Sequence, residues 1–360
     1  MILFSISSFF FFYFTVVGVY VIFMPKILQN LNYTSLQIGI IFAIAPLMRF
    51  IIPFLFLKLI KLTRNVFYIA LLISIFSVSL FYVSIENFYL FAIPNLIFGG
   101  SLGLILPYIE TYAMEHLKKE RFGRSRLFGS IGFMLIGIVL AKHLENYENG
   151  LHFLLGGIVL CAIFGILVTQ NNPTLKAEAP KEDDIFLLSK AKYFWVSMFF
   201  MQVSFGAFYN FFTIYETDHG ISLEIVSYLW AFGVICEIAL FYFQAPFLRN
   251  INLLSLMKIA VTMTIIRWLM LFCFPDNLFV SFASQSLHAF SFALHHTAAI
   301  SFLYTLYANK KLATQFYYGF SFGLGGFVGA LLAGYFYGPY LYLYASIVAG
   351  LSLWALFFKK

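Results

Sequence analysis

Charged side chains are rare in the long apolar runs of this sequence, and those present could bind a polar solute or carry a proton. Glu110 and Arg126 flank one short basic segment, whereas Glu237, Arg267 and His288 lie in three successive apolar runs. A charge in hydrocarbon is costly, so each such residue is a candidate functional residue. An imidazole can exchange protons near neutral pH. A carboxyl can do so when its surroundings favour the protonated form.

Glu110 and Arg126 are expected at the facing ends of two antiparallel helices joined by a short loop, where they could pair. Two interpretations stay open for the pair. It could bind a polar or anionic group of a substrate, or it could be a salt bridge at the level of the lipid headgroups. In either case these are charges that lie close to hydrocarbon, where an unpaired charge is unfavourable.

Two later runs carry polar and small residues at helical spacing, so each set is expected to share one face of a helix. We interpret both faces as lining a cavity, with Gln202, Tyr209 and Trp230 as substrate-binding candidates. Core packing is the alternative for the aromatic residues. The stripes contain Gln202, Gly206, Tyr209 and Thr213 in the first run, and Trp230, Gly233 and Glu237 in the second.

Glu237, Arg267 and His288 are candidate functional residues, because each is a charged or titratable side chain inside an apolar run. Glu237 is the expected proton carrier and Glu110 the second choice, because no other carboxylate is expected well within the apolar runs; a structural pair with Arg267 is the alternative for Glu237. The next run places Gln285, His288 and His295 at i, i+3 and i+10, with Ser291 and His296 near the same face. Its histidines have no accompanying carboxylate or cysteine, so neither a metal site nor a cofactor is expected.

The elements that hold these residues must be membrane-spanning helices. The chain has 360 residues, of which 62% are hydrophobic and 10% are charged, far from the quarter or so charged in soluble domains. Apolar runs of about 20 residues are long enough to cross hydrocarbon as helices. We predict an all-α membrane protein with twelve spans, placed at 2–23, 36–57, 65–84, 88–115, 125–143, 150–169, 191–215, 223–246, 252–273, 277–305, 312–336 and 340–358.

Basic residues indicate the orientation of these spans. One set of loops holds most of the Lys and Arg, whereas the other set is acidic and includes Glu216. The positive-inside rule then places both termini in the cytoplasm. The net charge of +7 is explained by these loops, so a nucleic-acid partner is not expected. The predicted location is the cytoplasmic (inner) membrane of a bacterium.

A polar stretch near the midpoint divides the chain. We predict an N-terminal six-helix bundle over 1–170, a cytoplasmic central loop over 171–190 and a C-terminal six-helix bundle over 191–360. Ser-Leu-Gln-Ile at 35–38 and Ser-Leu-Glu-Ile at 222–225 open corresponding spans, which indicates an internal repeat. Repeated halves around a central site are typical of transporters.

Four segments resemble the major facilitator superfamily, in particular the lactose permease and phenylpropionate permease families. They are Pro-Tyr-Ile-Glu at 107–110, the segment 122–133 with its Arg-Leu-Phe-Gly-Ser, Trp-Ala-Phe-Gly-Val-Ile-Cys-Glu at 230–237, and Leu-His-Ala-Phe-Ser-Phe at 287–292. The resemblance covers nearly the whole chain and implies two bundles of six helices.

The same resemblance implies that Glu110 and Arg126 contribute to substrate binding. It also implies that Glu237, Arg267 and His288 belong to a proton-coupling network. Lactose permease has an acidic residue three positions after the histidine, where this chain has Ser291. Its proton carrier therefore does not transfer to this chain, and a sugar substrate is placed in doubt.

These patterns predict a secondary active transporter, a proton symporter for a small organic solute such as an aromatic acid, a sugar or a nucleoside. Alternating access and a functional monomer in the lipid bilayer are expected. Sodium coupling stays open, as does an antiporter that exports drugs or metabolites. A membrane enzyme is not expected, because no nucleophile with a base is evident. A non-transporting scaffold is the remaining alternative.

Overall fold

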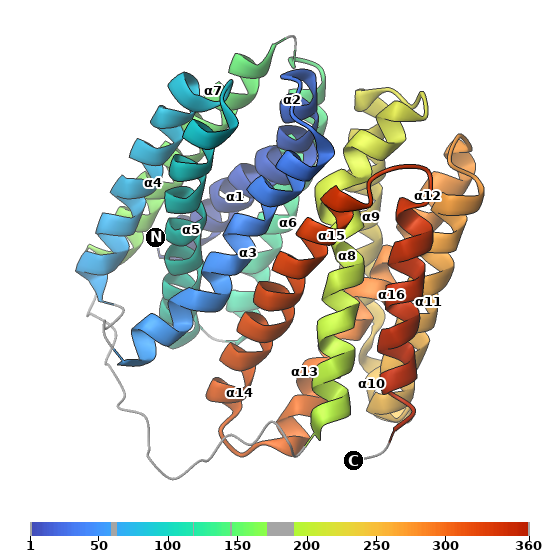
Figure 1. The fold of residues 1–360 in the computed structure, drawn as a ribbon. Coiled ribbons are helices and arrows are strands. Elements are labelled where there is room, and N and C mark those ends of the chain that lie inside the picture. The colour runs from blue at the N-terminus through green and yellow to red at the C-terminus, as the bar shows by residue number, and fades with distance from the viewer. Residues whose placement is uncertain (1, 59–62, 118, 145, 171–190, 359–360) are drawn as a thin grey trace. The chain divides into compact units, whose positions relative to one another are not determined.

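A computed structural model describes residues 2–58, 63–117, 119–144, 146–170 and 191–358, and every regular element in them is helical (Figure 1). They divide into two compact units, Met1–Ala179 and Pro180–Lys360. The central loop predicted over 171–190 lies outside the described residues, as do the terminal lysines of the predicted cytoplasmic end. The two-bundle boundary at 170 and 191 stays a prediction.

The first unit contains helical stretches joined by short turns, and its first stretch is interrupted by a π-helical segment. Its elements are α1 (Ile2–Gly18), η1 (Val19–Phe23), α2 (Met24–Asn30), α3 (Ser35–Lys58), α4 (Arg64–Ser84), α5 (Phe88–His116), α6 (Lys119–Ala141) and α7 (Tyr147–Thr169).

The second unit has the same kind of organisation, with two further π-helical segments late in the chain. Its elements are α8 (Lys192–Asp218), α9 (Leu223–Phe243), α10 (Ala245–Asn250), α11 (Leu253–Cys273), α12 (Leu278–Ser286), η3 (Ala289–Leu294), α13 (His295–Leu306), α14 (Lys310–Tyr317), η4 (Tyr318–Gly325), α15 (Gly326–Tyr335) and α16 (Leu341–Ala355).

Polar caps define where many of these helices begin. Asn87 accepts hydrogen bonds from two backbone amides of the first turn of α5, and Ser222 caps α9 through the amide of Ile225. Asn252 and Asn277 cap α11 and α12 in the same way. Such caps satisfy amides that have no partner within the helix, so each apolar run starts at a defined residue.

The two units repeat one pattern of neighbours. In the first, α1 packs along α6 and α7, and α4 packs against α5 and α7. In the second, α8 packs along α15 and α16, and α11 packs against η3, α13 and α16. The first helix of each unit therefore lies against the last two stretches of that unit, which is what an internal repeat produces.

Within the described residues, nine helices are long and apolar enough to cross a membrane. They include the stretches of the first unit and, in the second, α9, α11 and the stretch Leu312–Tyr335. The central helix α8 is not among them, although it is buried along most of its length. Burial against other helices explains why α8 can carry polar residues such as Gln202 and Asn210. The count of twelve spans stays a prediction.

Candidate functional site

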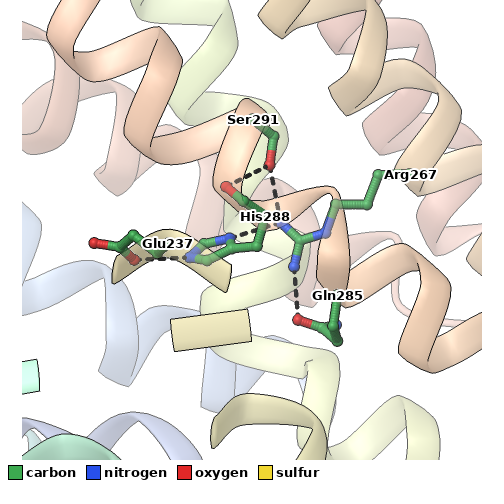
Figure 2. A network of polar contacts seen from close by, with 5 residues as sticks. All are labelled: Glu237, Arg267, Gln285, His288 and Ser291. Carbon is green, nitrogen blue, oxygen red and sulfur yellow. Dashed lines mark hydrogen bonds and ion pairs between the residues drawn. The ribbon is translucent and has the colours of Figure 1, made fainter. Parts of the chain in front are cut away.

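Five polar side chains meet inside the second unit and form the arginine network: Glu237, Arg267, Gln285, His288 and Ser291 (Figure 2). Helix α9 supplies the glutamate and α11 the arginine, while the stretch from α12 into η3 supplies the other three. A spacing of three residues puts those three near one helix face. The network thus joins α9, α11 and the stretch from α12 into η3.

Arg267 lies at the centre of the network and is fully buried. Its Nη1 contacts Nδ1 of His288 at 2.9 Å and donates to Oγ of Ser291 at 3.2 Å. Its Nη2 donates to Oε1 of Gln285 at 3.0 Å. A buried cation is tolerated only when acceptors or counter-charges surround it, and three acceptors surround this one.

His288 lies between the arginine and a carboxylate, as Figure 2 shows. A guanidinium can only donate hydrogen bonds, so the Nδ1 that faces Arg267 must be the unprotonated nitrogen. The proton of the neutral ring is then on Nε2, which lies 3.5 Å from Oε2 of Glu237. The histidine therefore serves as a neutral bridge between a cation and an anion. The charges of the network balance only while Glu237 is ionised.

Aromatic rings also pack against the guanidinium. The carbon at its centre lies 4.1 Å from the ring centroid of Phe208 and 4.6 Å from that of Trp268. Trp230 packs against Phe208 in a tilted arrangement, with 4.4 Å between the ring centroids, and donates from Nε1 to Oγ1 of Thr213 at 3.0 Å. These contacts stabilise a cation by cation–π attraction while excluding water.

Local backbone features bring the helices of the network together. A Cβ on Gly233 would lie 3.1 Å from Oε1 of Gln285, so the glycine lets α9 approach that side chain closely. The π-helical segment η3 starts directly after His288 and contains Ser291. Single π-helical turns inside helices are frequent at functional sites. Here the turn carries the hydroxyl that meets the arginine.

Two donors in the network have no partner within the described residues. They are Nε of Arg267 and Nε2 of Gln285, both buried. Buried donors normally find an acceptor. These two donors could therefore each donate a hydrogen bond to an acceptor atom, such as a carboxylate or hydroxyl oxygen of a bound solute.

The first unit holds a simpler arrangement, which we call the direct pair. Nε of Arg126 in α6 donates to Oε1 of Glu110 in α5 at 3.1 Å. The side chains are 36% and 30% exposed, respectively. The guanidinium lies 4.2 Å from the ring centroid of Phe14 and 5.4 Å from that of Phe10, both in α1. A Cβ on Gly129 would lie 2.6 Å from the ring of Phe14, so this glycine permits the close packing of α6 on α1.

Two of the remaining predicted binding residues, Trp230 and Tyr209, lie beside the arginine network through Phe208, whereas Gln202 packs towards Gly325. Tyr209 packs on Phe205 and Phe208. Gln202 lies nearer the start of α8. A Cβ added to Gly325 would lie 3.0 Å from the Cβ of Gln202. Gln202 and the arginine network thus occupy different parts of the second unit.

Two interpretations of small and acidic residues need correction. Gly206, expected to line a cavity, packs against another helix: a Cβ there would lie 2.2 Å from the carbonyl of Gly329 in α15. Glu216, expected in an acidic loop, lies within α8 and is fully buried. Hydropathy did not separate a helix end from a loop at this position, so local composition did not reveal this buried carboxyl.

Metal binding has no support in the described residues, where no group of three or more His, Cys, Asp or Glu could hold an ion. His295 is buried and His296 is partly buried, and they belong to α13 rather than to the arginine network. Among the described residues, His288 is therefore the histidine that contacts both Arg267 and Glu237.

Comparisons with known proteins place this architecture among transporters. A family model described as "MFS_1 like family" matches residues 3–345. The "Uncharacterized transporter YwbF" of Bacillus subtilis (strain 168) is 24% identical over 329 residues, which cover 87% of this chain and 79% of that protein. The "Probable 3-phenylpropionic acid transporter" of Escherichia coli (strain K12) is 22% identical over 230 residues, or 60% of this chain and 59% of that protein.

Solved structures share the fold over the full chain. The nucleoside transporter NupG superimposes with a TM-score of 0.76 at 16% identity, and the alignment covers 100% of both chains. The POT family transporter PepTSo gives a TM-score of 0.75 at 10% identity, covering 99% of this chain and 95% of that one. At these identities the likeness establishes the fold and leaves the solute to be argued from the site.

Proposed function

This chain belongs to the MFS_1 like family and is a membrane transporter, and we propose that it is a proton symporter for a small organic acid. The observation that carries the proposal is the bridge of His288 between Arg267 and Glu237. This bridge links a buried cation to a partly exposed carboxylate, so that the charge state of one affects the other.

Charge balance provides the coupling in this proposal. While Glu237 is ionised, it compensates the charge of Arg267 through the neutral histidine. When Glu237 takes up a proton, the buried cation loses its counter-charge and attracts an anion more strongly, because charges interact strongly in a low dielectric. A substrate carboxylate can then replace the lost charge. Proton and anion are bound together more favourably than either alone, which is thermodynamic coupling.

An aromatic acid is the substrate class that these surroundings favour. Arg126 and Arg267 each lie over aromatic rings, and such rings suit an aromatic solute by stacking. The unpaired Nε of Arg267 and Nε2 of Gln285 are available for carboxylate oxygens once the site opens. The name of the Escherichia coli relative, a "Probable 3-phenylpropionic acid transporter", agrees with this class. Sugars and nucleosides are the competing classes.

The transport cycle in this proposal is alternating access between two halves, each with six of twelve spans, around a central site. The repeated pattern of neighbours in the two units supports it. Basic residues lie near helix ends that the positive-inside rule would put in the cytoplasm. They are Arg64, Arg121, Arg124 and Lys310. We accordingly expect a monomer in the cytoplasmic membrane of a bacterium, with both termini in the cytoplasm.

Purified protein in liposomes tests the proposal directly. Aromatic acids, sugars and nucleosides are supplied outside, and internal pH and solute content are followed together. We expect internal acidification with an aromatic acid, and loss of that acidification in Glu237→Gln. Glu224→Gln, which changes an exposed carboxyl of the same helix, is the matched control and should behave as wild type.

Other outcomes contradict particular parts of the proposal. Solute entry without proton movement would reject proton coupling, and entry that requires Na⁺ would replace it with sodium coupling. Proton-linked entry of a nucleoside or sugar alone would reject the organic acid. Efflux from preloaded vesicles, driven by an opposite proton gradient and without any uptake, would identify an antiporter.

A further inference from the structure

A buried carboxyl outside the arginine network has no part in the mechanism above. Glu216 lies in the last turn of α8 and is fully buried. Its Oε2 accepts a hydrogen bond of 2.9 Å from Oγ of Ser281 in α12. Its Oε1 is buried without a partner in the described part of the chain.

The surroundings of Glu216 contain no basic partner. Among the described residues it forms no ion pair with a Lys, Arg or His, unlike Glu110 and Glu237. The titratable groups within electrostatic range are Tyr215 of the same helix and Tyr342 of α16. The hydroxyl of Tyr342 is itself buried without a partner. These neighbours supply no positive charge that could compensate an ionised carboxylate.

Burial disfavours the ionised form of this carboxyl. An isolated ionised carboxylate is very costly to bury, whereas the neutral acid is a modestly polar group. One hydroxyl and one carboxyl also provide too few oxygen ligands for a bare metal cation, which requires several.

We propose that Glu216 and Ser281 form a second proton-binding site, in which the carboxyl is protonated in this conformation and releases its proton when α8 and α12 separate. The site lies at the C-terminal end of α8, remote from Lys192. The positive-inside rule assigns this end of the helix to the outer side of the membrane. It shares no residue with the arginine network.

Infrared spectroscopy of the protein in lipid tests this site without any substrate. A protonated carboxyl has a carbonyl stretch that is absent from a carboxylate. Near neutral pH we expect wild type to show such a band that is lost in Glu216→Gln. The control Glu224→Gln changes an exposed carboxyl and should leave the band intact. Ser281→Ala keeps the carboxyl and should shift the band, because its hydrogen bond is removed.

Thermal unfolding supplies an independent measurement. A group that binds a proton in the folded protein but ionises on exposure stabilises the fold less as the pH rises. The melting temperature of wild type should therefore fall more steeply between mildly acidic and mildly alkaline pH than that of Glu216→Gln. A neutral glutamine has nearly the shape of the protonated acid, so the variant should fold.

Three outcomes would overturn the proposal. A carbonyl band that persists in Glu216→Gln would show that the protonated group lies elsewhere. Equal pH dependence of unfolding in the two proteins would show that Glu216 is not linked to protons. Stabilisation by Na⁺ that disappears in Glu216→Gln would assign the site to a cation. None of these depends on transport, so a failed symport assay leaves the inference intact.

Discussion

The two units treat an arginine and a glutamate in contrasting ways. In the first, Arg126 and Glu110 touch directly at 3.1 Å, and about a third of each side chain is exposed. In the second, Arg267 is fully buried and reaches Glu237 only through His288. Both arginines lie over aromatic rings, so the difference lies in burial and in the bridge.

Burial decides how much each arrangement contributes to stability. A partly exposed ion pair contributes about 0–1 kcal/mol to the stability of the fold, because water competes for its charges. Breaking a buried pair by removing one partner costs about 3–5 kcal/mol. The direct pair can therefore exchange its partner for a solute at little cost, whereas the arginine network resists disruption.

The bridge decides what a proton can do. In the direct pair, protonation of Glu110 releases Arg126 at a position that is already partly exposed. In the arginine network, protonation of Glu237 changes the charge balance around a cation that water does not reach. The contrast suggests a division of labour, with solute capture in the first unit and coupling in the second.

The largest expected effect is that of Arg267→Gln. It removes the cation that three acceptors surround and leaves Glu237 without a counter-charge. We expect transport to fall to background and stability to fall by about 3–5 kcal/mol, measured as uptake into liposomes and as thermal unfolding in detergent. Unchanged uptake would show that the network is not needed for transport.

The double variant Arg267→Gln with Glu237→Gln separates the two effects. Removing both charges leaves no uncompensated charge, so much of the lost stability should return. Transport should stay absent, because neither the cation nor the proton carrier is present. Recovery of uptake in the double variant would reject the charge-balance mechanism.

The next largest effect is that of His288→Ala, with His288→Gln as its control. A glutamine amide has an acceptor oxygen and a donor NH2 group, so it can accept from Arg267 and donate to Glu237 as the neutral histidine does. We expect uptake to be lost in the alanine variant and retained, within about tenfold, in the glutamine variant; tenfold corresponds to about 1.4 kcal/mol. Loss of coupling in both variants would indicate that the ring itself carries a proton.

The direct pair should respond to Arg126→Lys in binding and not in stability. Lysine keeps the charge but loses the planar fork and its stacking on Phe14. A lost charge-assisted hydrogen bond is worth about 1.5–3 kcal/mol, so solute affinity should fall roughly tenfold to hundredfold. The melting temperature should stay near that of wild type. An unaltered affinity would favour the salt bridge at the headgroups, the alternative interpretation of this pair.

Much of the helical framework could be predicted, because hydropathy and capping residues act locally. The apolar run predicted at 252–273 corresponds to α11 (Leu253–Cys273), and the run at 65–84 to α4 (Arg64–Ser84). Asn252 and Thr63 cap these helices. Lipid requires long apolar helices, and side-chain caps fix their first residues.

Details that depend on helix rotation could not be predicted. Regular helical spacing along the apolar run at 312–336 would put Gly319 on the same face as Gly323 and Gly326. The π-helical segment η4 changes that spacing. Gly325 and Gly329 are consequently the positions closest to α8, whereas a Cβ on Gly319 would meet nothing within 4 Å.

The candidate site was partly predictable for a similar reason. Arg267 and His288 stand out because charge is rare in apolar runs, and the resemblance to known permeases joins them with Glu237. Glu216 was assigned to a loop because a helix end and a loop have similar composition. Its burial depends on the packing of Ser281 and Tyr342 from distant parts of the chain, which no local pattern reveals.

The smallest expected effect compares glycines that shape the two arrangements. Gly233→Ala would place a Cβ 3.1 Å from Oε1 of Gln285, and Gly129→Ala one at 2.6 Å from the ring of Phe14. Alanine is otherwise favoured over glycine in a helix by about 0.5–1 kcal/mol. Gly350→Ala, whose Cβ would meet nothing within 4 Å, measures that gain alone.

We expect the gain to appear in Gly350→Ala and to be cancelled in both other variants, by strain of similar size. In Gly233→Ala the displacement of Gln285 should also weaken solute-linked proton uptake, because that side chain accepts a hydrogen bond from Arg267 in the arginine network. In Gly129→Ala the displaced Phe14 should weaken solute affinity while leaving the number of protons per solute unchanged. If Gly129→Ala altered that ratio, coupling would extend into the first unit and the division of labour would fail.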